Sequence, residues 1–181
     1  MNEELIKIIE GCKKQKYRAQ KALYDRYAPL LFGVCMRYFK DSNDAADALQ
    51  EGFIKIYDSI GSFKGDGSFE GWIKRIQVNL CLMELRKNKK LIYVEEMHEV
   101  SDEESEEADY LTAYSSNQIF EAIENLPSGC QTIFNLYAID GFNHREIATT
   151  LAISEGTSKS QFSRAKKILK EQLLKQASIA C

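Results

Sequence analysis

Cationic and hydroxyl side chains recur with helical spacing near the C-terminal end of the chain. Lys159 and Ser163 are four residues apart, as are Ser160 and Arg164, so each pair shares one face of a helix. Short side chains beside long cations allow such a helix to approach a phosphate backbone closely. We therefore expect this face to contact duplex DNA, through Thr157, Lys159, Ser160, Ser163, Arg164 and Lys167.

Two helical patterns separated by a tight break must position these side chains. The periodicity predicts helices over residues 143–151 and 155–175, and Ser154 is placed to cap the second one. The inward positions of the two helices are Ile147, Ala148 and Leu151, then Ser158, Phe162, Ala165 and Leu169. This is the layout of a helix-turn-helix, in which the second helix enters the major groove.

The distribution of charge supports contact with a polyanion, although the net charge is −3 and the pI is near 5.6. Residues 1–90 hold 17 Lys and Arg against 12 Asp and Glu. Residues 91–117 hold 9 acidic residues and no Lys or Arg, and residues 118–181 hold 7 basic against 6 acidic residues. Two segments with a basic excess therefore flank an acidic tether, and the local sign of charge decides where a polyanion docks.

The composition excludes several classes of protein. Five scattered cysteines without a CxxC pair predict reduced thiols, and no apolar run approaches the roughly 20 residues of a membrane span. The acidic, periodic N-terminus is unlike a signal peptide, so we expect a cytoplasmic protein. The chain contains no Gly-rich phosphate loop, nucleophile elbow or paired catalytic acids, which predicts a protein that is not an enzyme and needs no cofactor.

Helical periodicity dominates the rest of the chain and predicts an all-α fold. The expected helices are 2–15, 17–39, 42–59, 69–87, 117–125, 128–139, 143–151 and 155–175. We expect two small helical domains, 1–90 and 117–181, joined by a flexible acidic linker over 91–116. The acidic block is too long for a connection within one compact domain.

An aromatic and basic loop marks the N-terminal domain. Phe63, Lys64 and Gly65 begin a loop that leads into the helix 69–87, whose inner face is Phe69, Trp72, Ile73 and Ile76. An aromatic ring can stack on an unstacked base, glycines permit close approach, and cations neutralise phosphates. The loop and helix could therefore hold a melted segment of DNA.

In sequence order, several stretches together resemble one family. They are ALYDRYAPLLF, DAADALQEGFIKIY, SFKGDGSFEGWIKRIQVNLCLMELRK, an acidic linker, LPSGCQTIF and REIATTLAISEGTSKSQFSRAKKIL. This ordered set resembles the bacterial extracytoplasmic function (ECF) sigma factors, and the resemblance covers nearly the whole chain.

The resemblance implies partners and roles. The N-terminal domain would bind the clamp coiled coil of core RNA polymerase through Asp47, Gln50, Glu51 and Lys55. It would read and melt the promoter −10 element with Phe63, Lys64, Gly65, Lys74, Arg75, Asn79 and Arg86. The C-terminal domain would read the −35 element, and the polymerase flap is a further expected contact. Many relatives are held inactive by an anti-sigma factor, which adds a candidate partner.

Four residues depart from the family pattern: Gln131, Ser158, Gln161 and Phe162. The pattern usually has a cation at position 161, so its absence predicts a weaker phosphate contact. A β-branched apolar residue is common at position 158, so the serine predicts looser packing there.

Two other functions remain as alternatives. A stand-alone helix-turn-helix regulator would bind a symmetric operator without polymerase. A metal-dependent nucleotide hydrolase would use the acidic run that contains Glu103, Glu104 and Glu107. The step from Glu95 to His98 matches half of a di-iron motif, but the second half is missing, so we expect no metal site.

Overall fold

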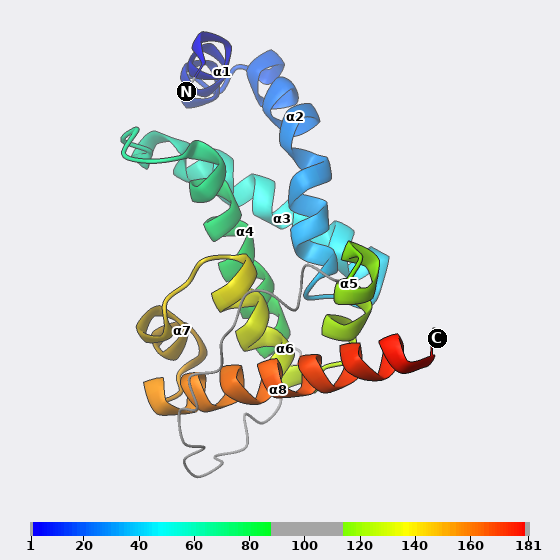
Figure 1. Cartoon of the computed structure of the whole chain (residues 1–181). Coiled ribbons are helices and arrows are strands. Elements are labelled where there is room, and N and C mark those ends of the chain that lie inside the picture. Colours follow the sequence, from blue (N-terminus) through cyan, green and yellow to red (C-terminus); the bar gives the residue numbers. More distant parts are fainter. Residues whose placement is uncertain (1, 88–113, 180–181) are drawn as a thin grey trace. The chain divides into compact units, whose positions relative to one another are not determined.

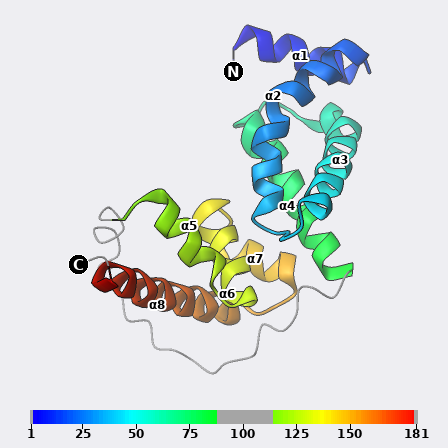
Figure 2. The ribbon, with the colours of Figure 1, turned by 90° about the vertical axis from the view of Figure 1, so that its right-hand side faces the viewer.

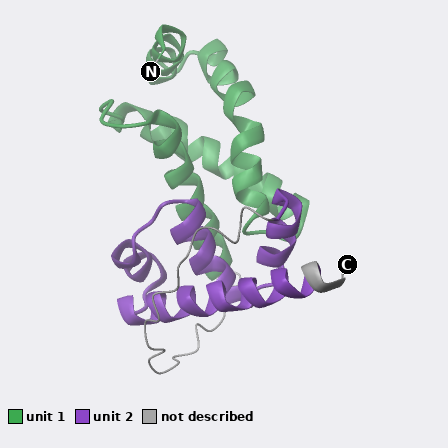
Figure 3. Cartoon of the chain, in the orientation of Figure 1, with its two compact units in different colours: residues 1–90 green, residues 91–181 purple. Residues whose placement is uncertain are grey.

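The computed structural model describes residues 2–87 and 114–179, and every regular element in these ranges is helical. The predicted all-α fold is therefore confirmed. The chain divides into two compact units, Met1–Lys90 and Leu91–Cys181 (Figure 3). Most of the predicted acidic linker lies outside the described residues. Among the helices of the described ranges, none combines the length and apolarity needed to cross a bilayer.

The described residues of unit 1 form four helices and one short 3-10 turn. They are α1 (Glu3–Lys13), α2 (Tyr17–Met36), α3 (Ser42–Ser59), η1 (Ile60–Ser62) and α4 (Phe69–Lys87). Helices α2, α3 and α4 pack against one another in all three pairs, whereas α1 packs on α2 and η1 (Figures 1 and 2). The core of unit 1 is built from one apolar stripe on each helix, with Leu23, Leu31, Ile56, Ile73 and Leu82 fully buried.

The buried amide of Gln77 joins the three bundle helices of unit 1. Its Nε2 donates to the carbonyl oxygen of Ala48 at 2.8 Å, and it lies 3.1 Å from Sγ of Cys35. The amide fits only because Gly52 has no side chain, since a Cβ at position 52 would collide with Oε1 of Gln77. Gly52 and Gln77 therefore fix the spacing of α3 and α4.

Unit 2 is arranged around one long helix. Its elements are α5 (Ser116–Glu124), α6 (Ser128–Phe134), η3 (Asn135–Ile139), α7 (His144–Leu151) and α8 (Glu155–Ile179). Helices α5, α6 and α7 all pack on α8. The core includes Ala122, Ile123, Leu126, Cys130, Ala165, Leu169 and Leu173.

Local capping explains where the helices of unit 2 begin. Ser115 with Gln118, and Asn143 with Glu146, form reciprocal capping boxes at the starts of α5 and α7. The predicted helices agree with the observed bounds to within a few residues. The exception is 128–139, which was expected as one helix. It divides into α6 and the wider π-type turn η3 before Gly141.

The coupling between Gly52 and Gln77 generates a stability prediction. Gly52→Ala should lower the free energy of unfolding of unit 1 by about 2 kcal/mol, because the new methyl group overpacks the Gln77 site. In Gly52→Ala/Gln77→Ala the loss should be smaller than the sum of the two single losses by about 1 kcal/mol, because the truncated side chain leaves room. Urea unfolding followed by Trp72 fluorescence measures unit 1 alone, since Trp72 is the one tryptophan in the sequence.

The matched control is Gly33→Ala, at an exposed position in the last turn of α2, where a Cβ meets no atom within 4 Å. It should raise stability by about 0.5–1 kcal/mol through helix propensity. Strict additivity of the Gly52 and Gln77 changes would show that the two residues do not constrain each other.

Candidate nucleic-acid interface

The turn between α7 and α8 is held by two local features. Ala152 adopts a left-handed conformation, with φ of 56°, and its N–H donates to the carbonyl oxygen of Ala148. Oγ of Ser154 accepts from the backbone N–H of Thr157 at 2.9 Å, so the predicted cap at the start of α8 is confirmed. These contacts set α7 and α8 as the two helices of a helix-turn-helix.

The predicted contact residues of α8 differ in how they are presented. Lys159 and Lys167 are exposed, whereas Thr157, Ser160, Ser163 and Arg164 are half-buried. Lys159, Ser163 and Lys167 follow one another at four-residue steps, so they form a single row on the helix. Two of the hydroxyls already have local partners: Oγ1 of Thr157 lies 2.8 Å from Oγ of Ser154, and Oγ of Ser160 donates to the carbonyl oxygen of Thr157. Among the predicted contact residues of α8, the row that begins at Lys159 is therefore the more accessible one.

The residues of α8 that depart from the family pattern belong to its inner face. Oγ of Ser158 is fully buried and lies 2.9 Å from Nδ1 of His144. Gln161 is 4% exposed and accepts from Sγ of Cys130 at 3.0 Å. The expected loss of a phosphate contact at Gln161 is therefore wrong, because position 161 faces the core. The expected looseness at Ser158 is also wrong, because the hydroxyl has a buried polar partner.

An aromatic cluster continues this inner face. Phe162 contacts Phe134 and Tyr137, with ring centroids 5.9 and 4.5 Å apart, and Tyr137 stacks on His144 at 4.3 Å. Burial, and then the charge of Lys159, lower the pKa of His144, so the stacked imidazole is neutral near pH 7. The histidine therefore has a structural place in unit 2 that its sequence context did not indicate.

The loop after η1 divides into a buried start and an exposed tip. Phe63 is only 7% exposed, and its ring lies 5.1 Å from Phe69 and 5.3 Å from Trp72. We expected the Phe63 ring to stack on a base. It is instead packed in the core, because Phe63, Phe69 and Trp72 bury one another. Lys64 and Gly65 are exposed, and the positive φ of Gly65, 87°, bends the chain at the tip.

Helix α4 presents a polar row beyond this loop. Arg75, Asn79 and Arg86 are exposed, and the steps of four and seven residues place them on one face. Lys74 is on another side of the helix, where its Nζ pairs with Oε1 of Glu70 at 2.8 Å. The structure therefore brings together three of the four α4 residues predicted to contact DNA.

Helix α3 carries the face predicted to bind polymerase. Asp47, Gln50, Glu51 and Lys55 are all exposed on it. Ile54 lies among them and is 54% exposed, a position that the sequence analysis did not single out. Protein-binding surfaces commonly have an apolar centre within a polar rim, and Ile54 with its polar neighbours has that arrangement. Its three-residue spacing from Glu51 was the signal that could have identified it.

No cluster of three metal-ligating side chains occurs in the described part of the chain. The acidic run with Glu103, Glu104 and Glu107, and the pair Glu95 and His98, lie outside the described residues.

Each of the two units matches the model of a known protein family. Residues 23–91 match the model of sigma-70 region 2, and residues 116–169 match sigma-70 region 4. The chain is 30% identical to the ECF RNA polymerase sigma factor SigW of Bacillus subtilis, over 96% of this chain and 98% of that protein. It is 27% identical to the RNA polymerase sigma-H factor of Pseudomonas aeruginosa, over 94% of both chains.

Solved structures share the fold. CnrH, in complex with the cytosolic domain of CnrY, is similar with a TM-score of 0.51 and 20% identity over 92% of this chain and 94% of that chain. The sigma factor RpoE of Bartonella quintana, in complex with the anti-sigma factor NepR, gives a TM-score of 0.52 and 21% identity over 84% of this chain and 95% of that one. The ordered helices, the helix-turn-helix and the near full-length similarity to SigW show that this chain belongs to the ECF family of RNA polymerase sigma factors.

Proposed function

We propose that this sigma factor directs core RNA polymerase to one class of promoter and assists strand opening there, without catalysing a reaction. The observation that carries the proposal is the match of unit 1 to sigma region 2 and of unit 2 to sigma region 4, in that order along one chain. Such a protein acts through binding free energy, and it acts where the polymerase is, in the cytoplasm.

Unit 2 would read the −35 element with α8. The row of Lys159, Ser163 and Lys167 lies opposite the buried row of Ser158, Ala165 and Leu169, so it can enter the major groove without disturbing the core. Lysines supply phosphate contacts that fix the register, and the short hydroxyl side chains leave room for base edges.

Unit 1 would act on the −10 element through the exposed tip of its loop and the face of α4. Lys64, Arg75 and Arg86 supply positive charge, and the amide of Asn79 can donate to and accept from a base edge. In this assignment Phe63 anchors the start of the loop to the core of unit 1, because its ring packs on Phe69 and Trp72.

The polymerase itself would bind the face of α3. Ile54 provides apolar contact, and Asp47, Gln50, Glu51 and Lys55 provide a polar surround. The clamp coiled coil is the proposed partner of this face, and the flap is the proposed partner of unit 2. Since the structurally similar CnrH and RpoE were solved with CnrY and the anti-sigma factor NepR, an anti-sigma factor is also a candidate partner.

The main experiment separates a sigma factor from a stand-alone regulator. Run-off transcription with purified core polymerase should depend on this chain, and a gel shift of promoter DNA should require both proteins. Strong, specific binding of the isolated chain to a symmetric operator, unchanged by core polymerase, would instead favour the regulator.

Lys159→Gln should weaken binding of the holoenzyme to promoter DNA, because one phosphate contact is lost. The slope of log K against log salt concentration should become shallower by about 0.9. Fluorescence anisotropy between about 50 and 200 mM salt, a range over which phosphate contacts change affinity strongly, measures this slope. Lys175→Gln removes the same charge from an exposed position further along α8 and should leave the slope unchanged. An equal change in both variants would mean that the row on α8 has no special role.

Asn79→Ala should impair opening and spare recognition of the −35 element. We expect run-off transcription from a duplex promoter to fall roughly tenfold, the loss of about one base contact. If Asn79 reads a base, a template whose −10 region is already melted, with its sequence unchanged, should not fully restore transcription by the variant. Binding of the variant to an isolated −35 duplex should stay at the wild-type level. Asn43→Ala removes another exposed amide of unit 1 as the control. Wild-type transcription by Asn79→Ala would contradict the role of this residue.

Ile54→Ser should weaken assembly with core polymerase about tenfold, because an interface side chain of this size contributes roughly 1–3 kcal/mol when buried. Titration of core polymerase against fluorescently labelled protein measures the change in Kd. Ile6→Ser, at an exposed isoleucine of α1, is the matched control and should retain the wild-type Kd. Equal affinity of the Ile54→Ser protein and the wild type would remove α3 from the interface.

A further inference from the structure

Two cysteine thiols meet inside unit 1. Cys35 lies on α2 and Cys81 lies on α4, and both side chains are fully buried. The two Sγ atoms are 3.9 Å apart, and neither belongs to a disulfide. The two residues are 46 positions apart in the sequence, so only the fold brings them together. The proposed function uses neither thiol.

The sulfur of Cys35 accepts two hydrogen bonds. The thiol of Cys81 donates to it, and Nε2 of Gln77 donates to it at 3.1 Å. The same Nε2 lies 3.8 Å from Sγ of Cys81, and its bond to the carbonyl oxygen of Ala48, at 2.8 Å, holds it in place. Hydrogen bonds donated to a sulfur favour its thiolate form, so Cys35 is the better nucleophile of the pair.

The ionisation of Cys35 differs from that of two other buried thiols. The hydrogen bond from Cys81 is the main cause that lowers the pKa of Cys35, and burial opposes it. Burial raises the pKa of Cys12 to about 11 and also raises the pKa of Cys130. The thiolate is the form that reacts with oxidants, so Cys35 should react before Cys12 and Cys130.

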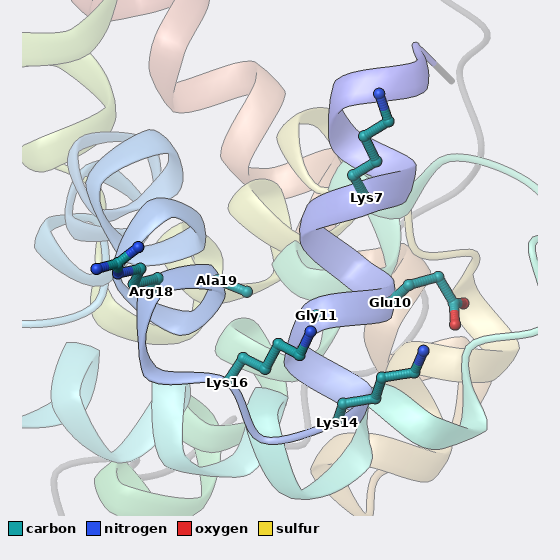
Figure 4. Close-up of a pocket in the computed structure, with 7 residues that line it drawn as sticks. All are labelled: Lys7, Glu10, Gly11, Lys14, Lys16, Arg18 and Ala19. Atoms are coloured by element: carbon teal, nitrogen blue, oxygen red, sulfur yellow. The ribbon is translucent and has the colours of Figure 1, made fainter.

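The position of Cys35 in α2 gives an oxidant a route to its sulfur. The start of α2 is held against α1, where Gly11 meets Ala19 (Figure 4). Cys35 instead lies one residue before the end of α2 at Met36, whose side chain is 41% exposed. The ends of helices open more readily than their middles, so brief opening of this last turn admits a small oxidant.

We propose that Cys35 and Cys81 form a modification site, at which hydrogen peroxide converts the two thiols to an intramolecular disulfide. The Cys35 thiolate attacks a peroxide oxygen, so an S–O bond forms and the O–O bond breaks. The hydroxide that leaves becomes water with the proton that the Cys35 thiol released. The Cys81 sulfur then attacks the Cys35 sulfur, so the S–S bond forms and the S–O bond breaks. The second hydroxide takes the Cys81 proton, and the peroxide has been reduced to two waters by one electron from each sulfur.

The disulfide changes how α4 packs on α2. The sulfurs move from 3.9 Å to about 2.0 Å apart, and the hydrogen bond from Cys81 to Cys35 is lost. Asn79 lies on α4 only two residues before Cys81, so a shift of this helix moves the face assigned to the −10 element. This consequence rests on the proposed function, whereas formation of the disulfide does not.

The test treats the folded, complete chain with hydrogen peroxide and maps its thiols. Cys181→Ser is present throughout, so that a fifth thiol cannot exchange with the pair. After quenching, alkylation in denaturant and peptide mass spectrometry should find Cys35 linked to Cys81, and dithiothreitol should reverse the link. Cys12 and Cys130 should remain thiols.

Two variants check the order of the steps. In Cys81→Ser the reaction should stop at the sulfenic acid of Cys35, which dimedone traps. Cys130→Ser removes a buried thiol of unit 2 and should form the disulfide at the wild-type rate. Unfolding followed by Trp72 fluorescence establishes that every variant is folded. If peroxide links Cys35 to Cys81 only after urea has unfolded the wild type, or not at all, the proposal is overturned.

A second measurement separates the disulfide from the proposed function. The chain is oxidised, freed of peroxide and then assembled with untreated core polymerase. Run-off transcription should fall severalfold and return with dithiothreitol, whereas peroxide should not change transcription by Cys35→Ser/Cys81→Ser. Full transcription by the linked chain would overturn the effect on α4 alone. Failure of the untreated wild type to transcribe would count against the proposed function, and the mapped disulfide would still stand.

Discussion

Burial of one face of each helix in a small core is the constraint on which this structure depends. In unit 2 it acts most clearly on α8, where Ser158, Ala165, Leu169 and Leu173 are buried beneath α5, α6 and α7. Because successive positions rotate by about 100° around a helix, burying this row leaves the row that begins at Lys159 outside. The surface available for DNA is thus a consequence of packing.

The polar contacts inside the two units serve the same purpose. The Gln77 amide connects α4 to α2 and α3, and the Ser158 hydroxyl connects α8 to α7 through His144. A buried polar group is stable only with a partner in a defined place, so each of these contacts favours one register of the helices. The register in unit 1 sets the positions of Arg75 and Asn79 on α4, and the register in unit 2 sets the position of Lys159 on α8.

Helix positions and faces were largely predictable, because they depend on short-range periodicity and capping. The cap of α8 at Ser154 followed from spacing within one segment, whereas the residues of the α3 face and of the α4 row were implied by the family resemblance. The misjudged residues were those whose environment comes from distant segments. Gln161 has a polar side chain of the kind that can contact DNA, but Cys130, more than thirty residues away, is its buried partner. Phe63 lies in a polar loop, yet Phe69 and Trp72 enclose it.

By itself, the sequence determined the helical class, the order of the helices, the acidic segment between two groups of them and the faces that carry positive charge. These properties follow from residue type and from spacings of three and four positions. Only the tertiary structure decided which polar side chains are buried, where Ile54 stands as an exposed apolar group, and that Gly11 and Ala19 meet where α1 and α2 approach each other. The physical reason is that these properties depend on the distance between helices, which is set by packing across the core and is not encoded in the periodicity of any one segment.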